Sequence, residues 1–415
     1  MRTYRELFSL REFRALFLGT TLSVASSTMG TLGLSGLVYA HTGSPFLSSV
    51  AFLAGFLPYL AGAMTLGALT DRVPPRLLLA GWPVVRAVAC GVLASGALSV
   101  PAALALVMVL GYLESVPKAV ALSLVVDLLP GGGYVLGRST LNLAVGAMQV
   151  AGFGGGGLLM GLVGPYAALW AAAGAQLAVA AVYRVGLRAR PPRAAGELRF
   201  AEAVSDTWRG NKALFERREV RGLLFLQWVP NGLIVGAEAL YVPYAGDAAG
   251  ALFACSAAGM FAGDLVVGRW TDPARRLRLA VPLYTLLALP FLAFALRPGP
   301  VLGCVLVGVA CFGFAGHLGT QERYLDAVPD HLRGQAMGLA SAGMQTHQAL
   351  AATLTGAVAE FLPVPVTMAL AGAASLAVSG CLRPHLTGRP AARPAAAGPA
   401  GGPAAGRPDR SGHPG

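Results

Sequence analysis

Long apolar runs constrain the fold of this chain more than any other feature of its sequence. Between residues 13 and 383 they recur at the length of about 18 to 25 residues that an α-helix needs to cross a bilayer. Lipid offers no partner for backbone N–H and C=O groups, so a segment that crosses it must pair these groups internally. Each run is therefore predicted to be a transmembrane helix, and the chain an all-α membrane protein.

The composition supports this interpretation. Charged residues make up 12% of the chain, about half of the roughly 25% found in soluble domains. Hydrophobic residues make up 55% of it. Most of the chain therefore has no aqueous surface to cover.

The runs predict twelve transmembrane helices, called spans one to twelve here. Their expected limits are 13–40, 47–69, 77–99, 102–127, 138–163, 166–187, 221–244, 248–270, 278–297, 300–325, 336–361 and 364–383. Between spans six and seven, residues 188–219 are predicted to form a cytoplasmic linker with an amphipathic helix around Phe200, Val204, Trp208 and Leu214. Residues 386–415 are mostly Gly, Pro, Ala and Arg. They cannot bury a core and are predicted to be a disordered cytoplasmic tail.

The two halves of the chain repeat the same polar landmarks. The matched positions, 201 residues apart, are Gly62 and Gly263, Gly67 and Gly268, Thr70 and Thr271, and Asp71 and Asp272. The segment REFR at 11–14 also recurs as REVR at 218–221, and Asp127 recurs as Asp326. An internal duplication is the simplest source of such a pattern. It predicts two pseudo-symmetric bundles of six helices, at residues 1–187 and 220–385.

Basic residues mark one side of the membrane. They gather before span one, between spans two and three, in the central linker, between spans eight and nine, and after span twelve, whereas the opposite connections hold almost no charge. In membrane proteins, the loops between spans that are rich in Lys and Arg face the cytoplasm. Both termini are thus predicted to be cytoplasmic, in a multi-pass protein of the plasma membrane. The net charge of +12 then serves orientation and contact with the lipid surface, and no nucleic-acid partner is expected.

The loop after span two, GALTDRVPPR at 67–76, resembles the loop motif of the major facilitator superfamily. The twelve spans, the duplication and the echo of this loop at 268–276 agree with that resemblance. It implies two six-helix bundles around one central site, which opens to each side of the membrane in turn. The segments at 127–130 and 326–334 are most similar to the exporter branch that includes drug and siderophore efflux proteins.

Span five departs from the antiporter members of that branch. They carry a Gly-Pro pair at a position where this chain has Gly152 followed by Phe153. The glycines that follow, Gly154 to Gly157, allow helices to approach closely. They predict close packing and a sliding surface between spans five and eight.

The resemblance also implies a conformational latch at the cytoplasmic ends of spans two and eight. The loop acid is expected to cap the next helix, where free N–H groups and the helix dipole stabilise a carboxylate. The alternative is an ordinary loop with solvated charges. The residues assigned to the latch are Gly67, Asp71, Arg72, Arg76, Asp127, Gly268, Asp272, Arg276 and Asp326.

Polar residues inside the spans are the candidates for a substrate or proton pathway, because a charge at bilayer depth is costly. Glu114 and Lys118 lie four residues apart in span four, a spacing that favours a direct ion pair on one helix face. By resemblance, spans one, four, seven and ten line the central cavity. The residues placed toward it are Glu114, Lys118, Asn231, Glu238 and His317, and a second set comprises Arg86, Gln149, Gln345 and His347.

Several of these candidates have an alternative explanation. In the alternative interpretation, the Glu114–Lys118 pair only stiffens span four. Glu238 would then reach water near the outer end, and His317 would be a packing histidine. Arg86 lies in a span that is peripheral in this fold, and it would pair with a loop acid or extend to the headgroups. His347 lies near the middle of the membrane, and an imidazole titrates near physiological pH, so a proton or substrate role is open to it.

Enzyme chemistry finds no support in the sequence. It contains no Gly-x-Ser-x-Gly, no His-Glu-x-x-His and no paired Cys/His spacing, and the glycine-rich loop at 131–137 lacks the Lys-Ser/Thr of a phosphate loop. Its five cysteines lie in or at the end of apolar runs and are interpreted as packing residues. No cofactor and no metal are expected.

The sequence therefore predicts a secondary active transporter, expected as a monomer, that moves a small organic molecule across the bilayer. Proton-coupled efflux of a drug, siderophore or other secondary metabolite is the favoured interpretation, with the proton gradient as the driving force. A proton-driven importer of a small metabolite is one alternative. A membrane sensor or scaffold that kept the fold without transport is another.

The predicted topology can be tested with a reporter fused after Gly388. A reporter that is active only in the cytoplasm is expected to be active there, and one that is active only in the periplasm is expected to be silent. The opposite pattern would show that the number of spans is wrong.

Overall fold

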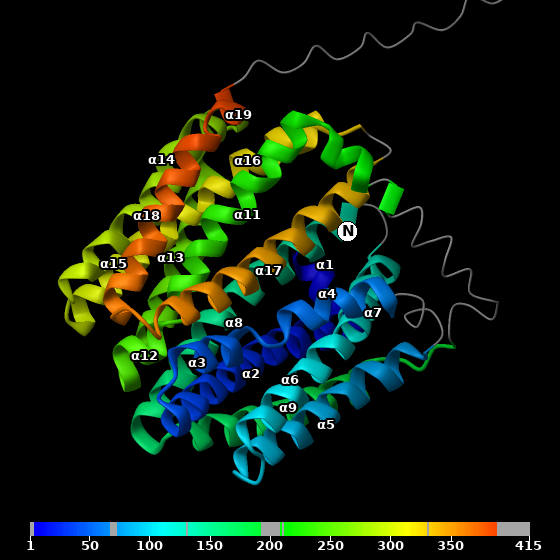
Figure 1. Ribbon diagram of the computed structural model, residues 1–415. Coiled ribbons are helices and arrows are strands. Elements are labelled where there is room, and N and C mark those ends of the chain that lie inside the picture. Colours follow the sequence, from blue (N-terminus) through cyan, green and yellow to red (C-terminus); the bar gives the residue numbers. More distant parts are fainter. Residues whose placement is uncertain are drawn as a thin grey trace, which may run out of the picture.

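The computed structural model describes residues 4–66, 73–129, 132–191, 208–209, 211–329 and 332–387. All regular structure in these ranges is helical, and the helices form two bundles that lie side by side (Figure 1). The N-terminal half consists of α1 (Tyr4–Ser9), α2 (Arg11–Thr42), α3 (Pro45–Leu53), α4 (Phe56–Thr65), α5 (Pro75–Ala94), α6 (Val100–Leu113), α7 (Ser115–Leu128), α8 (Gly132–Val163) and α9 (Pro165–Gly186).

The C-terminal half repeats this order of long and broken helices. It consists of α11 (Arg218–Glu238), α12 (Tyr241–Ala245), η2 (Gly246–Ala248), α13 (Ala249–Trp270), α14 (Pro273–Ala288), η3 (Leu289–Leu296), α15 (Pro300–Phe312), η4 (Gly313–Ala315), α16 (Gly316–Ala327), α17 (Arg333–Val358), α18 (Val364–Leu382) and α19 (Pro384–Thr387). We call the end of the bundles where α2 begins and α18 ends the inner end, and the opposite end the outer end.

Each of the twelve predicted spans corresponds to one helix or to one broken helix. Nine segments of the described residues are long and apolar enough to cross a membrane, and one of them, Arg218–Trp270, contains spans seven and eight. The two spans outside this set are the second and the eleventh. Span two is divided into α3 and α4, and span eleven (α17) carries Gln, His and Thr side chains. Both lie between the two halves, where α17 packs on α3 and α4.

Span four is broken in the middle, and Pro117 explains the position of the break. A proline has no N–H to donate, and its ring clashes with the carbonyl four residues earlier, here that of Leu113. The helix is accordingly interrupted at Glu114, between α6 and α7. In the second half, span ten is interrupted at Gly313, where α15 gives way to η4. Glu114 and Gly313 are 199 residues apart, the same separation as Asp127 and Asp326, so the two breaks occupy equivalent places in the duplication.

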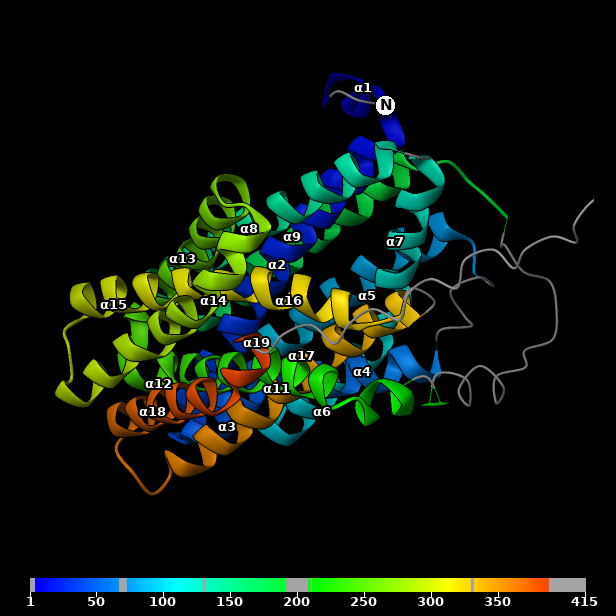
Figure 2. The ribbon, with the colours of Figure 1, turned by 90° about the horizontal axis from the view of Figure 1, so that it is seen from above.

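The two halves contact each other along α8 and α13 and where α3 meets α17; both views show these pairs side by side (Figures 1 and 2). A side chain at Gly157 would collide with Gly250, so the backbones of α8 and α13 touch directly there. Gly154 also faces α13, as predicted for the packing of spans five and eight, whereas Gly156 of the same run packs on α2. Outside that run, Gly161 faces η2 and Gly152 packs on α2.

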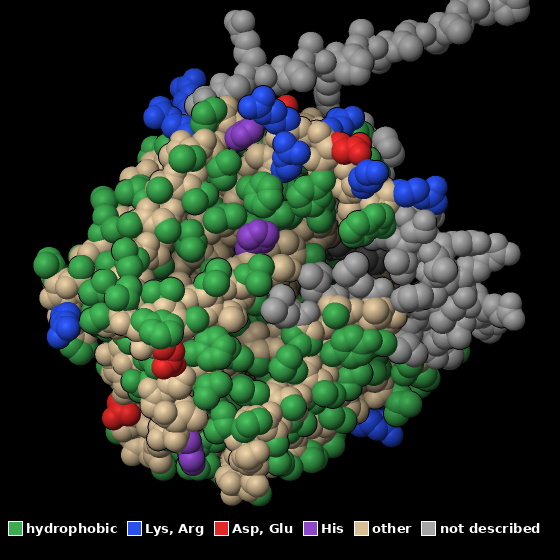
Figure 3. Space-filling model, viewed as in Figure 1, with side chains coloured by type: hydrophobic (Ala, Val, Ile, Leu, Met, Phe, Trp, Pro, Cys, Tyr) green, Lys and Arg blue, Asp and Glu red, His purple; other side chains and the backbone are tan. Residues whose placement is uncertain are grey.

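Charge is distributed unevenly over the surface. In the view of Figure 3, Lys and Arg side chains gather around α19 and the inner ends of α11 and α16, whereas the rest of the described surface shows mainly hydrophobic side chains interspersed with uncharged side chains and backbone. This distribution is what the positive connections of the sequence lead us to expect. The orientation of the two termini in the membrane stays a prediction.

The helical segment 211–216 before α11 belongs to the C-terminal core. Leu214 is fully buried in the same cluster as Val220 and Leu223, whereas Trp208 is 68% exposed. The predicted amphipathic helix thus packs part of its apolar face on protein. Phe200 and Val204, which were expected on the same face, lie outside the described residues, as does the tail after residue 387.

Candidate functional site

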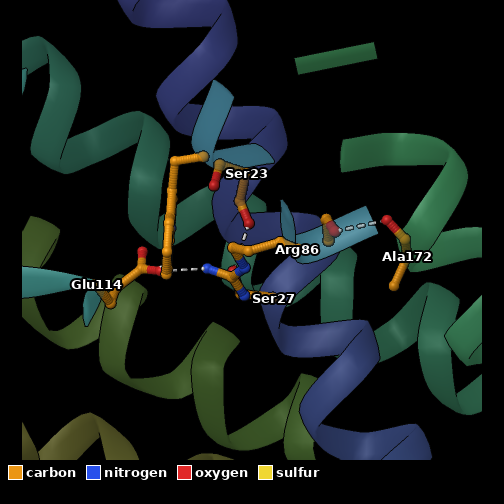
Figure 4. Close-up of polar contacts among 7 residues, drawn as sticks. Ser23, Ser27, Arg86, Glu114 and Ala172 are labelled. Atoms are coloured by element: carbon orange, nitrogen blue, oxygen red, sulfur yellow. Dashed lines mark hydrogen bonds and ion pairs between the residues drawn. The ribbon is translucent and has the colours of Figure 1, made fainter. Parts of the chain in front are cut away.

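Glu114 is the centre of a polar cluster in the N-terminal half (Figure 4). Its Oε2 atom accepts a hydrogen bond of 2.7 Å from the indole Nε1 of Trp82 and lies 3.0 Å from Nη1 of Arg86. The other terminal nitrogen of Arg86 donates to Oγ of Ser27 at 2.8 Å. Both ion-pair partners are largely buried, with side chains 20% and 17% exposed. The cluster joins span one (α2), span three (α5) and the break of span four.

The cluster corrects two expectations. Glu114 does not pair with Lys118; its charged partner is Arg86, on a different helix. Arg86 reaches neither a loop acid nor the headgroups, because Glu114 and Ser27 take both of its terminal nitrogens. The break at Glu114 accounts for the first error, since the spacing rule for ion pairs assumes an unbroken helix.

Lys118 lies beside the cluster but outside the ion pair. Its ammonium is 4.5 Å from the centroid of the Tyr59 ring on α4. Within the described part of the chain, no carboxylate lies within 4.0 Å of it, and the residue is exposed. Lys118 is therefore a cation of span four without an acidic partner.

The C-terminal half has a polar pair at the matching place. Nδ1 of His317 lies 3.7 Å from Oδ1 of Asp264, and the same nitrogen lies 3.0 Å from the carbonyl of Phe314. His317 follows Lys118 by 199 residues, so these two residues occupy equivalent positions after the breaks of spans ten and four. Asp264 was not among the predicted site residues.

Glu238 and Asn231 do not face a cavity. Glu238 is 6% exposed and accepts a hydrogen bond of 3.2 Å from the Cys311 thiol on α15, so it neither lines the central site nor reaches water at the outer end. Asn231 is 4% exposed, and its amide lies against the sulfur of Met344 on α17 at 3.1 Å. Both residues lie inside the core of the C-terminal half because α11 is buried on most of its circumference.

His347 lies in an aromatic cluster where α11 meets α17. Its ring stacks on Trp228 with centroids 5.1 Å apart, and Phe225 approaches it edge-on at 6.1 Å. Nδ1 is bound to the carbonyl of Gly343 at 2.8 Å, which leaves Nε2 for a ligand or a proton. The remaining predicted polar residues, Gln149 and Gln345, are exposed and half-buried, respectively.

All predicted latch residues of the second half lie within the described part of the chain. Oδ1 of Asp272 accepts a hydrogen bond of 2.8 Å from the backbone N–H of Arg275 and thereby caps the N-terminus of α14. Arg276 binds the carbonyl of Gly268 at 2.7 Å and pairs with Glu322 rather than with Asp326, which is exposed.

In the first half, Arg76 donates two hydrogen bonds to the carbonyl of Arg184 at the end of α9. Asp127 is exposed at the end of α7 and has an interaction of its own. Gly67, Asp71 and Arg72 lie outside the described residues. The role of the whole set as a latch stays a prediction.

The outer ends of the two halves are joined by Glu360, at the end of span eleven. One of its carboxylate oxygens accepts hydrogen bonds from the Ser44 hydroxyl and, at 3.1 Å, from the backbone N–H of Phe46. Because Ser44 and Phe46 form the N-terminus of α3, the carboxylate also meets the positive end of that helix. Oγ of Ser49 bonds the carbonyl of Ala239 at 3.4 Å. Glu360 and Ser49 thus provide hydrogen bonds between the two halves near their outer ends.

Three aromatic rings continue this contact inward. Phe253 of α13 stacks on Phe52 of α3 and on Phe153 of α8, with centroids 4.7 and 4.9 Å apart. Phe153 is the residue that replaces the proline of the antiporter pattern. We therefore find the two halves closed against each other on the outer side.

Two residues that the sequence reasoning missed carried a usable signal. Asp264 is an acid inside an apolar run, and the rule that selected Glu114 would have selected it too. Trp82 has a polar N–H that needs a partner when it is buried. Glu360, by contrast, is exposed at the end of a helix, and nothing in the local sequence distinguishes it from a solvated acid.

Comparisons with known proteins agree with this architecture. The sequence profile described as Major Facilitator Superfamily matches residues 16–321. The chain belongs to the Major Facilitator Superfamily. The comparison with curated protein sequences gives no match. The superfamily consists of secondary transporters rather than enzymes, so this chain moves a small molecule across a lipid bilayer.

Solved structures of other members of the superfamily share the fold. The nucleoside transporter NupG is 12% identical, with a TM-score of 0.69, and covers 91% of this chain and 100% of its own. A POT family transporter in complex with 5-aminolevulinic acid is 11% identical, with a TM-score of 0.69, and covers 91% and 97%. A bacterial homologue of the human lysosomal transporter Spinster, inward-facing and unoccupied, is 16% identical, with a TM-score of 0.64, and covers 93% and 95%.

The Arg86–Glu114 pair can be tested through stability. Replacement Arg86→Met leaves a carboxylate buried without its cation, which costs about 3–5 kcal/mol in comparable buried pairs. We expect a clear fall in the apparent melting temperature of the purified protein. The double variant Arg86→Met/Glu114→Met is expected to regain most of the loss, and the exposed Arg269→Met serves as control. Equal losses in the single and double variants would contradict a direct pair.

The contact of Glu360 with Ser44 and Phe46, called the outer contact here, can be tested by labelling. Ser49 is fully buried beneath this contact. A cysteine introduced as Ser49→Cys is therefore expected to react slowly with a membrane-impermeant maleimide added from outside. Adding Glu360→Ala removes the acceptor of the Ser44 and Phe46 hydrogen bonds, so labelling should become several-fold faster. The exposed Glu216→Ala is the matched control. An unchanged rate in the Glu360→Ala background would show that Glu360 does not hold the outer ends together.

Proposed function

We propose that this transporter exports a small organic molecule in exchange for protons. The observation that carries the proposal is the pair of polar sites at the two equivalent helix breaks. Broken transmembrane helices at matching places of an inverted or duplicated fold are typical of substrate and ion sites. Here one break carries Glu114 with Arg86 and Lys118, and the other precedes His317 with Asp264.

The depth of these groups supports a role in transport. Lys118 and His317 each lie ten residues before the end of their helix, which is about 15 Å at the helical rise of 1.5 Å per residue. That distance is half of a hydrocarbon core about 30 Å thick. Ionisable side chains at such a depth are costly and are kept where function requires them.

Alternating access then requires that the outer contact opens. In the present arrangement Glu360 and the three stacked phenylalanines join the outer ends, so the proposed central site would be reached from the inner side. Rocking of the halves about the direct backbone contact of α8 and α13 would break the Glu360 hydrogen bonds and separate Phe253 from its two neighbours. These bonds are few and lie at the surface, so their loss is compatible with a reversible cycle.

Asp264 and His317 are the proposed proton site. A carboxylate and an imidazole 3.7 Å apart can share a proton, and each of the two side chains can accept or release one. Oδ1 of Asp264 is buried and accepts no hydrogen bond from the described residues. A proton arriving from the outer side would be accommodated by this pair when the outer contact opens.

The outward direction of transport is supported by the sequence. The segments at 127–130 and 326–334 are similar to the exporter branch. The solved relatives named above concern nucleoside, POT family and Spinster-like transporters, and their low identity carries only the fold to this chain. Direction therefore has to be measured.

The test uses inverted membrane vesicles, in which export appears as uptake. Uptake of compounds from a metabolite panel is measured with an inward-acidic proton gradient and after its collapse. Gradient-dependent uptake of a panel member supports export, whereas uptake only in right-side-out vesicles would show an importer. Absence of transport in both orientations, with the folded protein present, would favour the sensor or scaffold alternative.

Variants of the proton site separate coupling from substrate passage. Asp264→Asn and His317→Gln are expected to reduce gradient-driven uptake at least tenfold, because the pair can no longer exchange its proton. Exchange of labelled for unlabelled substrate without a gradient should persist in both. Asp247→Asn, an exposed acid at the outer end, is the control. Full gradient-driven uptake in both variants would exclude this pair as the proton site.

A further inference from the structure

The strongest unassigned feature of the molecule is the uncompensated charge of Lys118. In the middle of the N-terminal half, the cations Arg86 and Lys118 face the single acid Glu114. Glu114 binds Arg86 at 3.0 Å and Trp82 at 2.7 Å through the same oxygen. The charge of Arg86 is thereby balanced. The ammonium of Lys118 lies over the Tyr59 ring, and no carboxylate of the described residues is within 4.0 Å of it.

The exposure of Lys118 is compatible with a position on the cavity side of span four. Its aromatic partner, Tyr59, belongs to α4, and α4 packs on α17 of the other half. The ammonium therefore lies on the side of α7 that is turned toward α4 and the contact between the halves. An ammonium at this depth that faced lipid would be strongly unfavourable. A water-filled space between the halves is the environment that explains both its exposure and its charge.

A contact with the face of a tyrosine is a weak substitute for an anion. A cation over an aromatic ring is attracted only by the ring quadrupole, whereas a cation beside an anion gains a charge-assisted hydrogen bond, which is stronger. Tyr59 therefore holds the ammonium in place without neutralising it. A ligand with a negative charge would neutralise the ammonium of Lys118, as Glu114 neutralises the guanidinium of Arg86.

We propose that Lys118 anchors the anionic group of the transported molecule, so that the substrate class is organic acids. Tyr59 orients the ammonium, and the Arg86–Glu114 pair fixes the break of span four from which Lys118 extends. This inference deepens the function proposed above and rests on it only in taking the bound molecule to be the transported one. Binding itself can be tested without any transport.

The small number of lysines allows the reactivity of Lys118 to be measured separately. Lys118 and Lys212 are its only lysines among 31 basic residues, and Lys212 is exposed in the helical segment before α11. In a Lys212→Arg background, Lys118 is the single lysine. Its reaction with formaldehyde and cyanoborohydride can then be followed by the mass of the peptide that contains it.

The experiment compares organic acids with their neutral amides on the purified full-length protein. The probes are benzoate, succinate and citrate at millimolar concentration, each beside its carboxamide. We expect Lys118 to be dimethylated in the absence of ligand, and at least one acid to slow the reaction at least fivefold while its amide does not. An ammonium that is unreactive in the folded protein but reactive in denaturant would overturn the proposal. So would protection by none of the acids, or equal protection by the amides.

Variants of Lys118 provide an independent measurement. The acid that protects Lys118 should raise the apparent melting temperature of the parent protein. Lys118→Arg is expected to retain this shift and Lys118→Met to lose it, with Lys212→Met unchanged. Persistence of the shift in Lys118→Met would overturn the assignment. Because no gradient is used, binding and export are measured separately. An acid that binds at Lys118 but is transported in neither vesicle orientation would keep Lys118 as an anion site and overturn both the proposed export and organic acids as the substrate class.

Discussion

The ion pair between Arg86 and Glu114 is the interaction on which the arrangement of the N-terminal half depends. It joins span three to the break of span four in the middle of the bilayer, where neither charge could remain without the other. Trp82 and Ser27 complete its hydrogen bonds, so spans one, three and four are tied together at a single depth. Pro117 creates the break and Glu114 occupies it, which places the carboxylate in reach of a neighbouring helix.

The duplication gives the second half the same break but different chemistry. Gly313 stands where the first half has Glu114, and it lets η4 approach the backbone of α14 near Leu283 and Leu287. No ion pair is needed there, because the helices touch directly. The titratable groups of the second half, Asp264 and His317, lie beside the break instead of within it. Equivalent positions thus carry a lysine in one half and a histidine in the other.

Much of the fold could be predicted from the sequence because its cause is local. A run of apolar residues dictates a span whatever surrounds it, and all twelve ranges correspond to helices or broken helices of the structure. The partners within the site could not be predicted in this way. Arg86 and Glu114 are 28 residues apart, and their contact depends on how spans three and four pack. Glu238 was misplaced for the same reason, since the side of α11 that faces Cys311 is decided by the neighbouring helices.

The asymmetry between the two halves suggests how substrate and proton could be coupled through one central space. An exchange of an acid for protons requires that the two are bound in turn. Electrostatic attraction cannot supply this alternation, because a bound anion favours a proton nearby. The conformational cycle has to supply it. Opening of the outer contact, which would release the acid from Lys118, would also expose the Asp264–His317 pair to protons from the outer side, so the coupling requires no contact between the two sites.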